Sequence, residues 1–264
     1  MNQNTLPGMR KAQEREMLPE VDLFPRVEYA GRKIDAAKFG PNTHNNNVAS
    51  MQKRYFHSDD LPNVTFKQLS TAESLAVASY NFANLAKPNI FNPNWLQAGR
   101  ILRAQEGVWI NPLIDTAGNI IQDGKELEES LSKVKKVNEI YLFDGGTSFV
   151  PYGSFEQGVQ EHGKFLESGL ARGLIHTSDK NANTLSQIAN DAEYPRGVNV
   201  WGFEPVKEPL VRVVSLGSGR NLDGGRLDVG GGWDGNSNSS SLGCAFGGLV
   251  SGEASTTQKI QDTH

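Results

Sequence analysis

Apolar residues recur at strand-like intervals in three short stretches near the C-terminal end of the chain. These stretches cover residues 211–214, 227–229 and 245–250, and polar, glycine-rich segments separate them. Alternation with a period of two is typical of strands that bury one face. The pattern therefore predicts three short strands joined by two exposed loops.

Upstream, the pattern predicts shorter strands and one amphipathic helix. Residues 63–67 and 139–143 have strand-like patterns, and residues 101–110 fit one bulged strand. The sequence Ser70-Thr-Ala-Glu73 has the form of a capping box and predicts a helix over residues 70–86. Trp95, in the turn-rich link after this helix, is expected to anchor the core.

Three further helices are predicted in the middle of the chain. Helix-forming residues of alternating charge favour a solvated surface helix over residues 125–137. Ser154 is suited to cap a helix that runs to about residue 168. Ser178 or Asp179 is suited to cap another that runs to about residue 191.

The glycine-rich segment is unusual in what it contains and in what it lacks. Eleven of the 28 glycines lie among the 34 residues 215–248, and no Lys, Glu, Gln or Met occurs over residues 210–251. Ordering so many glycines costs conformational entropy, which favours either disorder or strands that need tight turns. Diversification of Asn codons at their adenines would leave this composition, and so would a glycine-rich sheet with little use for long side chains.

Composition limits the class of protein and its partners. A chain of 264 residues can bury a sizeable core, and its net charge of −4 argues against nucleic acid as a partner. No stretch approaches 18 apolar residues, so we expect no membrane span. The N-terminal residues lack signal-peptide features, and Cys244 is the single cysteine. We therefore expect a cytoplasmic protein by default, with display on a virion or cell surface as open alternatives.

The composition also suggests a division of the chain. The polar residues 1–55 are expected to form an N-terminal extension or oligomerisation arm, so a homo-oligomer is an open alternative. Residues 56–136 are expected to form an α/β part packed on the core, which covers residues 137–252. Residues 253–264 form a tail.

Several motifs resemble a known family. The stretch Gly197-Val-Asn-Val-Trp-Gly-Phe203 is similar to the G-N-V-W-E-W box of the formylglycine-generating-enzyme subtype of the C-type lectin fold. Arg212-Val-Val214 and Gly231-Gly-Trp233 resemble parts of its R-V-x-R-G-G-S-W strand. Gly243-Cys-Ala-Phe246 with Leu249-Val250 stands where this family closes with G-F-R-L-V. Together these motifs resemble the variable proteins of diversity-generating retroelements.

The resemblance implies an α+β fold, in which two helices pack on a twisted, mainly antiparallel sheet and an N-terminal extension is added. The two predicted helices over residues 154–168 and 178–191 precede the glycine-rich strands, as this fold requires. Departures are the Gly202-Phe203 pair in place of Glu-Trp and the lack of an Arg after Phe246. The implied buried scaffold residues are Trp201, Trp233 and Phe246.

The resemblance also implies a ligand-binding surface in a variable region over residues 211–250. Short polar side chains there supply donors and acceptors, much as antibody loops do. The expected partner is a protein or a surface glycan, and no catalysis, metal or cofactor is expected. The expected ligand-binding residues are Ser215, Ser218, Asn221, Leu222, Asp223, Asp228, Asp234, Asn236, Asn238, Ser239, Ser240 and Ser241.

The known chemistries of related proteins do not fit these residues. Formylglycine generation needs a cysteine pair, and calcium-dependent sugar binding needs an E-P-N or Q-P-D loop, where this chain has Glu204-Pro-Val206 and Glu208-Pro-Leu210. Two rival functions stay open. One is an enzyme of the formylglycine-generating group with other chemistry, and the second is a structural protein of a virion or surface assembly.

Overall fold

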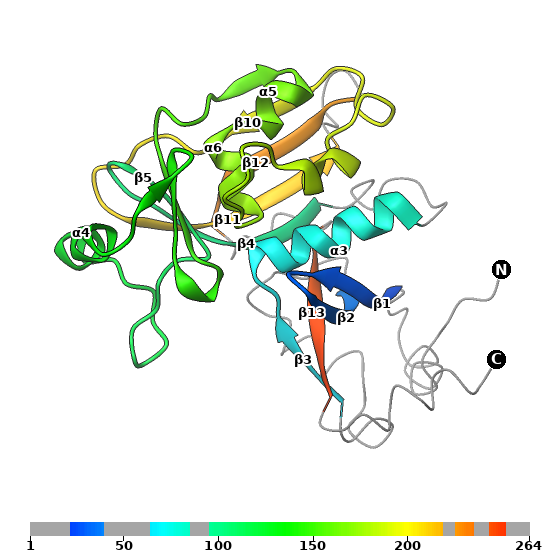
Figure 1. The fold of residues 1–264 in the computed structure, drawn as a ribbon, viewed down its shortest axis with the longest axis horizontal. Helices are drawn as coiled ribbons and strands as arrows, with labels where there is room; N and C mark the ends of the chain where they lie inside the picture. The colour runs from blue at the N-terminus through cyan, green and yellow to red at the C-terminus, as the bar shows by residue number, and fades with distance from the viewer. Residues whose placement is uncertain (1–21, 40–63, 85–94, 219–224, 235–242, 252–264) are drawn as a thin grey trace.

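The computed structural model describes residues 22–39, 64–84, 95–218, 225–234 and 243–251. These residues form a mixed α+β fold with one large, mainly antiparallel sheet and four α-helices (Figure 1). The α+β class expected from the sequence is therefore confirmed.

Five strands form the part of the sheet that carries the glycine-rich sequence. Their order is β4 (Trp95–Arg103), β11 (Leu210–Ser218), β12 (Leu227–Trp233), β10 (Val198–Trp201) and β9 (Gly158–Gln160). All neighbours are antiparallel except β10 and β12, which are parallel. Two of the three predicted C-terminal strands, β11 and β12, therefore lie side by side.

The sheet continues on the other side of β4 through shorter strands. β5 (Gly107–Ile110) pairs with β4, followed by β8 (Ser148–Pro151), β7 (Ile140–Leu142) and β6 (Lys136–Val137). The prediction of one bulged strand over residues 101–110 is wrong, because the chain turns back between β4 and β5 and the two strands pair with each other.

The third C-terminal strand leaves its two predecessors. β13 (Gly243–Ser251) pairs with β3 (Val64–Gln68) and with β2 (Arg32–Phe39), and it meets β4 over two residues. β2 forms a hairpin with β1 (Asp22–Tyr29). Part of the predicted extension 1–55 is therefore paired with the C-terminal strand (Figure 1).

The capping box predicted at Ser70 is confirmed. Helix α3 (Thr71–Asn84) begins after it, with the Glu73 amide donating to Ser70 Oγ and the Ser70 amide donating to Glu73 Oε2 at 2.8 Å. Glu73 also pairs with Arg32 of the N-terminal hairpin. One carboxylate thus joins the start of α3 to β2.

The predicted surface helix is shorter than expected. Helix α4 (Gly124–Ser132) is capped by Asp123, whose Oδ1 accepts from two amides of the first turn. Residues after it form a β6–β7 hairpin, with Asn138 and Glu139 at φ values of 43° and 70°. Two consecutive positive φ values are typical of the tight hairpin turn that ends the helical pattern predicted over residues 125–137.

The two helices predicted before the glycine-rich strands are mostly wrong in their bounds. Ser154 does not cap a helix, because its hydroxyl donates to the Pro151 carbonyl. The observed helices are α5 (His162–Leu166) and α6 (Gly169–Leu174), and Ser168 caps the second.

The segment predicted as a second helix over residues 178–191 holds only the 3₁₀ helix η3 (Asn183–Gln187). The Ala182 amide before η3 donates to the Leu166 carbonyl, and the Lys180 carbonyl accepts from Arg172. Long-range partners therefore use backbone groups that a continuous helix would need.

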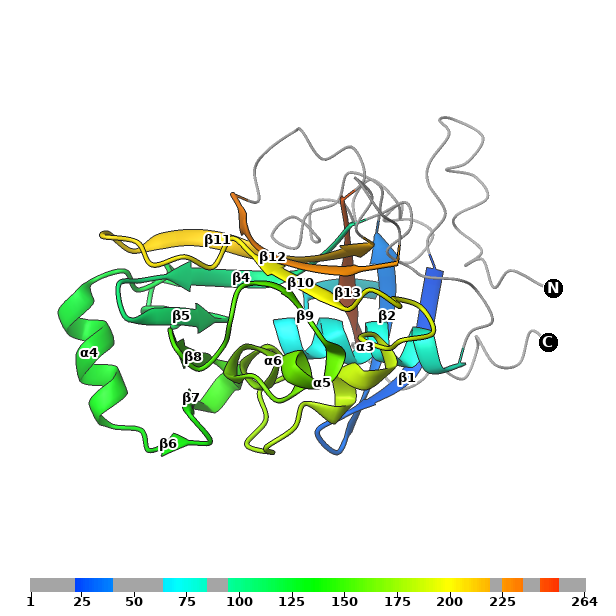
Figure 2. The same ribbon diagram turned by 90° about the horizontal axis from the view of Figure 1, so that it is seen from above.

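The main core lies between the sheet and helices α3, α5 and α6, which cover the same face of β4, β11, β12 and β10 (Figure 2). Phe246 of β13 is buried in it, as predicted, and so is Cys244. This leaves the opposite face of β10, β12 and β11 without a described helix.

Candidate ligand-binding face

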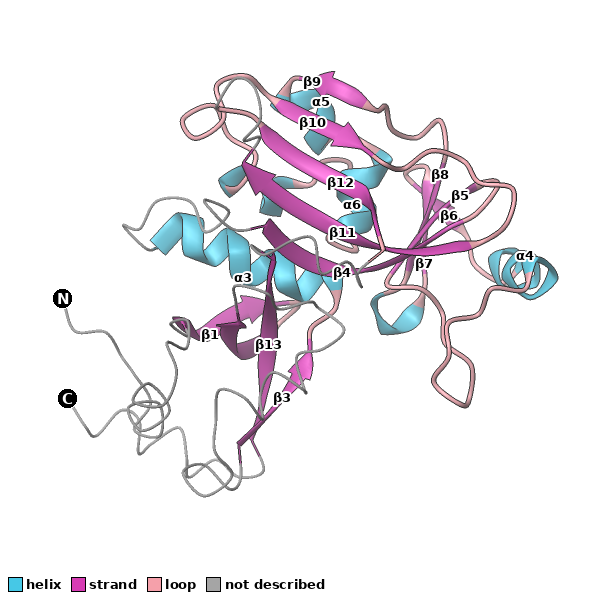
Figure 3. Cartoon of the chain, turned by 180° about the vertical axis from the view of Figure 1, so that it is seen from behind, coloured by secondary structure: helices cyan, strands magenta, loops and turns pink. Residues whose placement is uncertain are grey.

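Three of the four tryptophans gather on the face of the central strands that points away from helices α3, α5 and α6. Figure 3 shows β10, β12, β11 and β4 side by side, in front of these helices. In one row across the strands, Gln97 lies opposite Ser215, Ser215 opposite Gly230, and Gly230 opposite Trp201. Residues opposite each other in paired strands point to the same face.

Two further rows flank the first. On one side, Gly217 lies opposite Asp228, and Asp228 lies opposite Asn199. On the other side, Val213 lies between Arg100 and Trp233. We call this surface the tryptophan face and define it by these residues: Trp95, Gln97, Asn199, Trp201, Ser215, Gly217, Asp228, Gly230 and Trp233.

Glycines make room for two of the indole rings. A Cβ atom at Gly230 would lie 2.6 Å from Cζ2 of Trp201. A Cβ atom at Gly217 would overlap Cε3 of Trp95. The glycine content of β11 and β12 is therefore a packing requirement, because each ring lies directly on a backbone without side chains.

Trp201 and Trp233 contact each other edge to face, with ring centroids 6.3 Å apart and planes at 71°. Both are only partly buried, so the expectation that they are buried scaffold residues like Phe246 is wrong. Trp233 Nε1 is itself buried and has no hydrogen-bond partner among the described residues. The pair therefore offers aromatic surface to a ligand.

Asp228 is a charged group of the face, in the flanking row between Gly217 and Asn199. Asn199 Nδ2 donates to Asp228 Oδ1 at 2.8 Å. Burial raises the pKa of Asp228, and the bond from Asn199 and the charge of Arg226 only partly oppose this shift. The ionised form of Asp228 therefore lowers the stability of the fold. Carboxylates with a pKa shifted in this way are common at functional sites.

The structure places only some of the predicted binding residues on the tryptophan face. Asp228 lies on the tryptophan face, and Asp234 is exposed just after β12. Ser215 lies on this face but is 2% exposed, so a ligand cannot reach its hydroxyl directly. Ser218 is 3.4 Å from the buried Tyr194 hydroxyl, which is on the helix side.

The remaining predicted binding residues lie outside the described residues. They are Asn221, Leu222, Asp223, Asn236, Asn238, Ser239, Ser240 and Ser241.

The sequence reasoning missed three members of the face. Trp95 was expected to anchor the core but is partly buried over Gly217. Asn199 was not considered, although its alternation with Val198 and Val200 places it outward with Trp201. Gln97 is 4% exposed and its Oε1 has no hydrogen-bond partner, which only the packed structure reveals.

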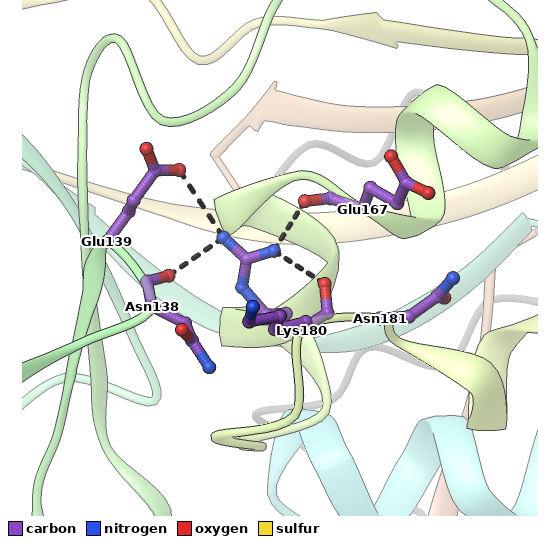
Figure 4. Close-up of a pocket in the computed structure, with 6 residues that line it drawn as sticks. Asn138, Glu139, Glu167, Lys180 and Asn181 are labelled. Atoms are coloured by element: carbon purple, nitrogen blue, oxygen red, sulfur yellow. Dashed lines mark hydrogen bonds and ion pairs between the residues drawn. The ribbon is translucent and has the colours of Figure 1, made fainter.

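A cavity of about 450 Å³ lies elsewhere, around the buried side chain of Arg172. Its guanidinium donates to the carbonyls of Glu167, Lys180 and Asn138, and Glu139 Oε2 lies 3.5 Å away (Figure 4). These acceptors come from the ends of α5, the segment before η3 and the β6–β7 turn. Arg172 thus has a structural role.

His162 and His176, the two histidines that the structure describes, have structural partners. Ser148 Oγ lies 3.0 Å from His176 Nδ1, but Ser148 is completely buried and its hydroxyl is closed to a substrate. His162 Nδ1 pairs with Asp191 at 2.7 Å. Over the described ranges, no group of three or more His, Cys, Asp or Glu is placed to hold a metal ion.

Comparison with protein-family models, curated proteins and solved structures finds no match to the chain. Among the described helices, none has the length and apolar character needed to cross a membrane.

Proposed function

We propose that the chain is a non-catalytic ligand-binding protein, similar to the variable proteins of diversity-generating retroelements and built on a C-type-lectin-like scaffold. The tryptophan face and the loop positions predicted from the sequence would contact a protein or glycan partner. The cytoplasm is the default compartment of this proposal.

The single observation that carries this proposal is the arrangement around Asp228. Trp95, Trp201 and Trp233 are partly exposed on one face, although indole rings contribute most to stability when they are buried. A desolvated carboxylate lies among them. Exposed aromatic surface with a few fixed polar groups is typical of binding sites, where the same features favour contact with a partner.

The glycine pattern supports the diversified origin. The rings of Trp95, Trp201 and Phe203 leave no free room for side chains at Gly217 and at the glycines 230–232. Asp228, between them in sequence, points outward and bonds to Asn199 on the same face. A scaffold of this kind tolerates exchange at outward positions while its backbone positions stay constant.

The test is a comparison of DNA sequences around the gene. We expect a near-identical copy of the DNA that encodes residues 209–250, beside a reverse transcriptase gene and differing mainly at adenines. The differences should include the codon of Asp228 and avoid the codons of Gly217 and residues 230–232. The absence of such a copy, or differences concentrated at these glycines, would contradict the diversified origin.

A further inference from the structure

We infer that the tryptophan face binds a pyranose sugar of a glycan, with the ring stacked on an indole and its hydroxyls bonded to Asp228 and Asn199. This inference rests on the proposed binding function and names its ligand class. It depends on the position of two indole rings beside Asp228, on the open oxygen of that carboxylate and on the charge of Arg226.

Two indole rings lie beside Asp228. Trp95 lies over Gly217 and Trp201 lies over Gly230. Gly217 is opposite Asp228 on β11, and Gly230 is the next residue of β12 that points to the same face as Asp228. The carboxylate therefore has an indole ring on two sides, and either ring can accept the flat C–H face of a pyranose.

The polar atoms on the face are incompletely paired. Among the described residues, Asp228 accepts a side-chain hydrogen bond through Oδ1 from Asn199 Nδ2, which leaves Asp228 Oδ2 as an acceptor. Gln97 Oε1 and Trp233 Nε1 also lack partners among the described residues, but both atoms are buried and a ligand reaches neither directly. Asp228 and Asn199 are therefore the polar groups of the face that a ligand can contact.

A sugar meets this mixture of acceptors and donors better than other ligands do. Each hydroxyl both donates and accepts, and vicinal hydroxyls are spaced to meet a carboxylate and an amide together. A flat apolar protein surface would leave these atoms unpaired.

The charges around the face argue against a cationic ligand. Aromatic rings beside a carboxylate also bind methylated ammonium groups. However, the charge of Arg226 acts on Asp228, and Arg100 lies in the row of Trp233. Arg226 partly offsets the negative charge of Asp228, and this weakens the attraction of the face for a cation.

The test is calorimetric titration of the full chain with maltohexaose, cellohexaose, chitohexaose and mannohexaose. We expect at least one of them to bind. Asp228→Asn should weaken that binding by about tenfold or more, because it removes hydrogen bonds to a charged group. Asp179→Asn, which makes the same change at an exposed residue after α6, should bind like the unchanged protein.

Three results would overturn the inference. They are the failure of all four saccharides to bind, equal affinity of the Asp228→Asn variant, and binding of a trimethyllysine peptide when no saccharide binds. A circular dichroism spectrum like that of the unchanged protein shows that the variant is folded. The DNA comparison is independent of these titrations, so a diversified binding protein with another ligand remains distinguishable from a failed functional proposal.

Discussion

Gly231 tests whether the glycines of β12 are packing requirements. A Cβ atom at this position would lie 2.6 Å from Cε1 and 2.7 Å from Cδ1 of Phe203, which is completely buried. Carbon atoms prefer separations of about 3.5–4.0 Å, so the ring or the strand must move by almost 1 Å in Gly231→Ala. The ring of Phe155 lies edge to face on Phe203 and restricts this movement.

The expected cost follows from two opposing effects. Overpacking a core by one methyl group costs about 1–3 kcal/mol. Replacing glycine by alanine also restricts the unfolded chain, which stabilises the fold by about 0.4–1 kcal/mol. We therefore expect Gly231→Ala to lower the free energy of unfolding by about 1–2 kcal/mol.

Urea denaturation followed by circular dichroism measures this change, with Gly163→Ala as the matched control. Gly163 lies in α5 with no atom within 4 Å of its hypothetical Cβ, so the same substitution there should stabilise the fold by about 0.5–1 kcal/mol. In a double-mutant cycle, Phe203→Leu should relieve part of the clash. Simple additivity of Gly231→Ala and Phe203→Leu, or no loss of stability in Gly231→Ala, would refute the packing argument.

Three other predictions concern buried polar groups. Arg172→Met should lower the free energy of unfolding by about 3 kcal/mol or more in urea, because three backbone carbonyls lose a charged donor. Burial lowers the pKa of His176 below its usual 6.5, so native His176 resists protonation and stability should fall as the pH is lowered from 7 to 5. His176→Asn, which suits the positive φ of 51°, should give a flatter pH profile. Because the pKa of Asp228 is raised, Asp228→Asn should unfold at the same or a higher urea concentration than the unchanged protein at pH 7, and this difference should shrink as the pH approaches 4.

The sequence predicted those elements whose boundaries are set by residues close to them in the chain. Helix α3 follows its capping box, and the three C-terminal strands follow the apolar alternation. The helices predicted over residues 154–168 and 178–191 failed because their boundaries depend on long-range contacts. In the first segment, residues 158–160 form β9 and pair with β10. In the second, the Lys180 carbonyl accepts a hydrogen bond from Arg172.

The candidate site was predictable only in part for the same reason. Asp228 was identified from composition, and Trp201 and Trp233 were identified from motifs as core residues. The exposure of Trp201 and Trp233 depends on which strands lie beside them. No local sequence pattern indicates that β10 pairs in parallel with β12. The position of Trp95 over Gly217 brings together residues more than a hundred positions apart, which no local pattern encodes.

The central claim is that Trp95, Trp201 and Trp233 form one ligand-binding face. The most direct measurement is a titration of the ¹⁵N-labelled chain with the saccharide that binds in calorimetry, observed through its four tryptophan indole N–H signals. Trp109 is 1% exposed in a separate core cluster and serves as an internal reference. The account predicts that the signals of the three face tryptophans shift while that of Trp109 stays in place, and unchanged face signals at saturation would contradict it.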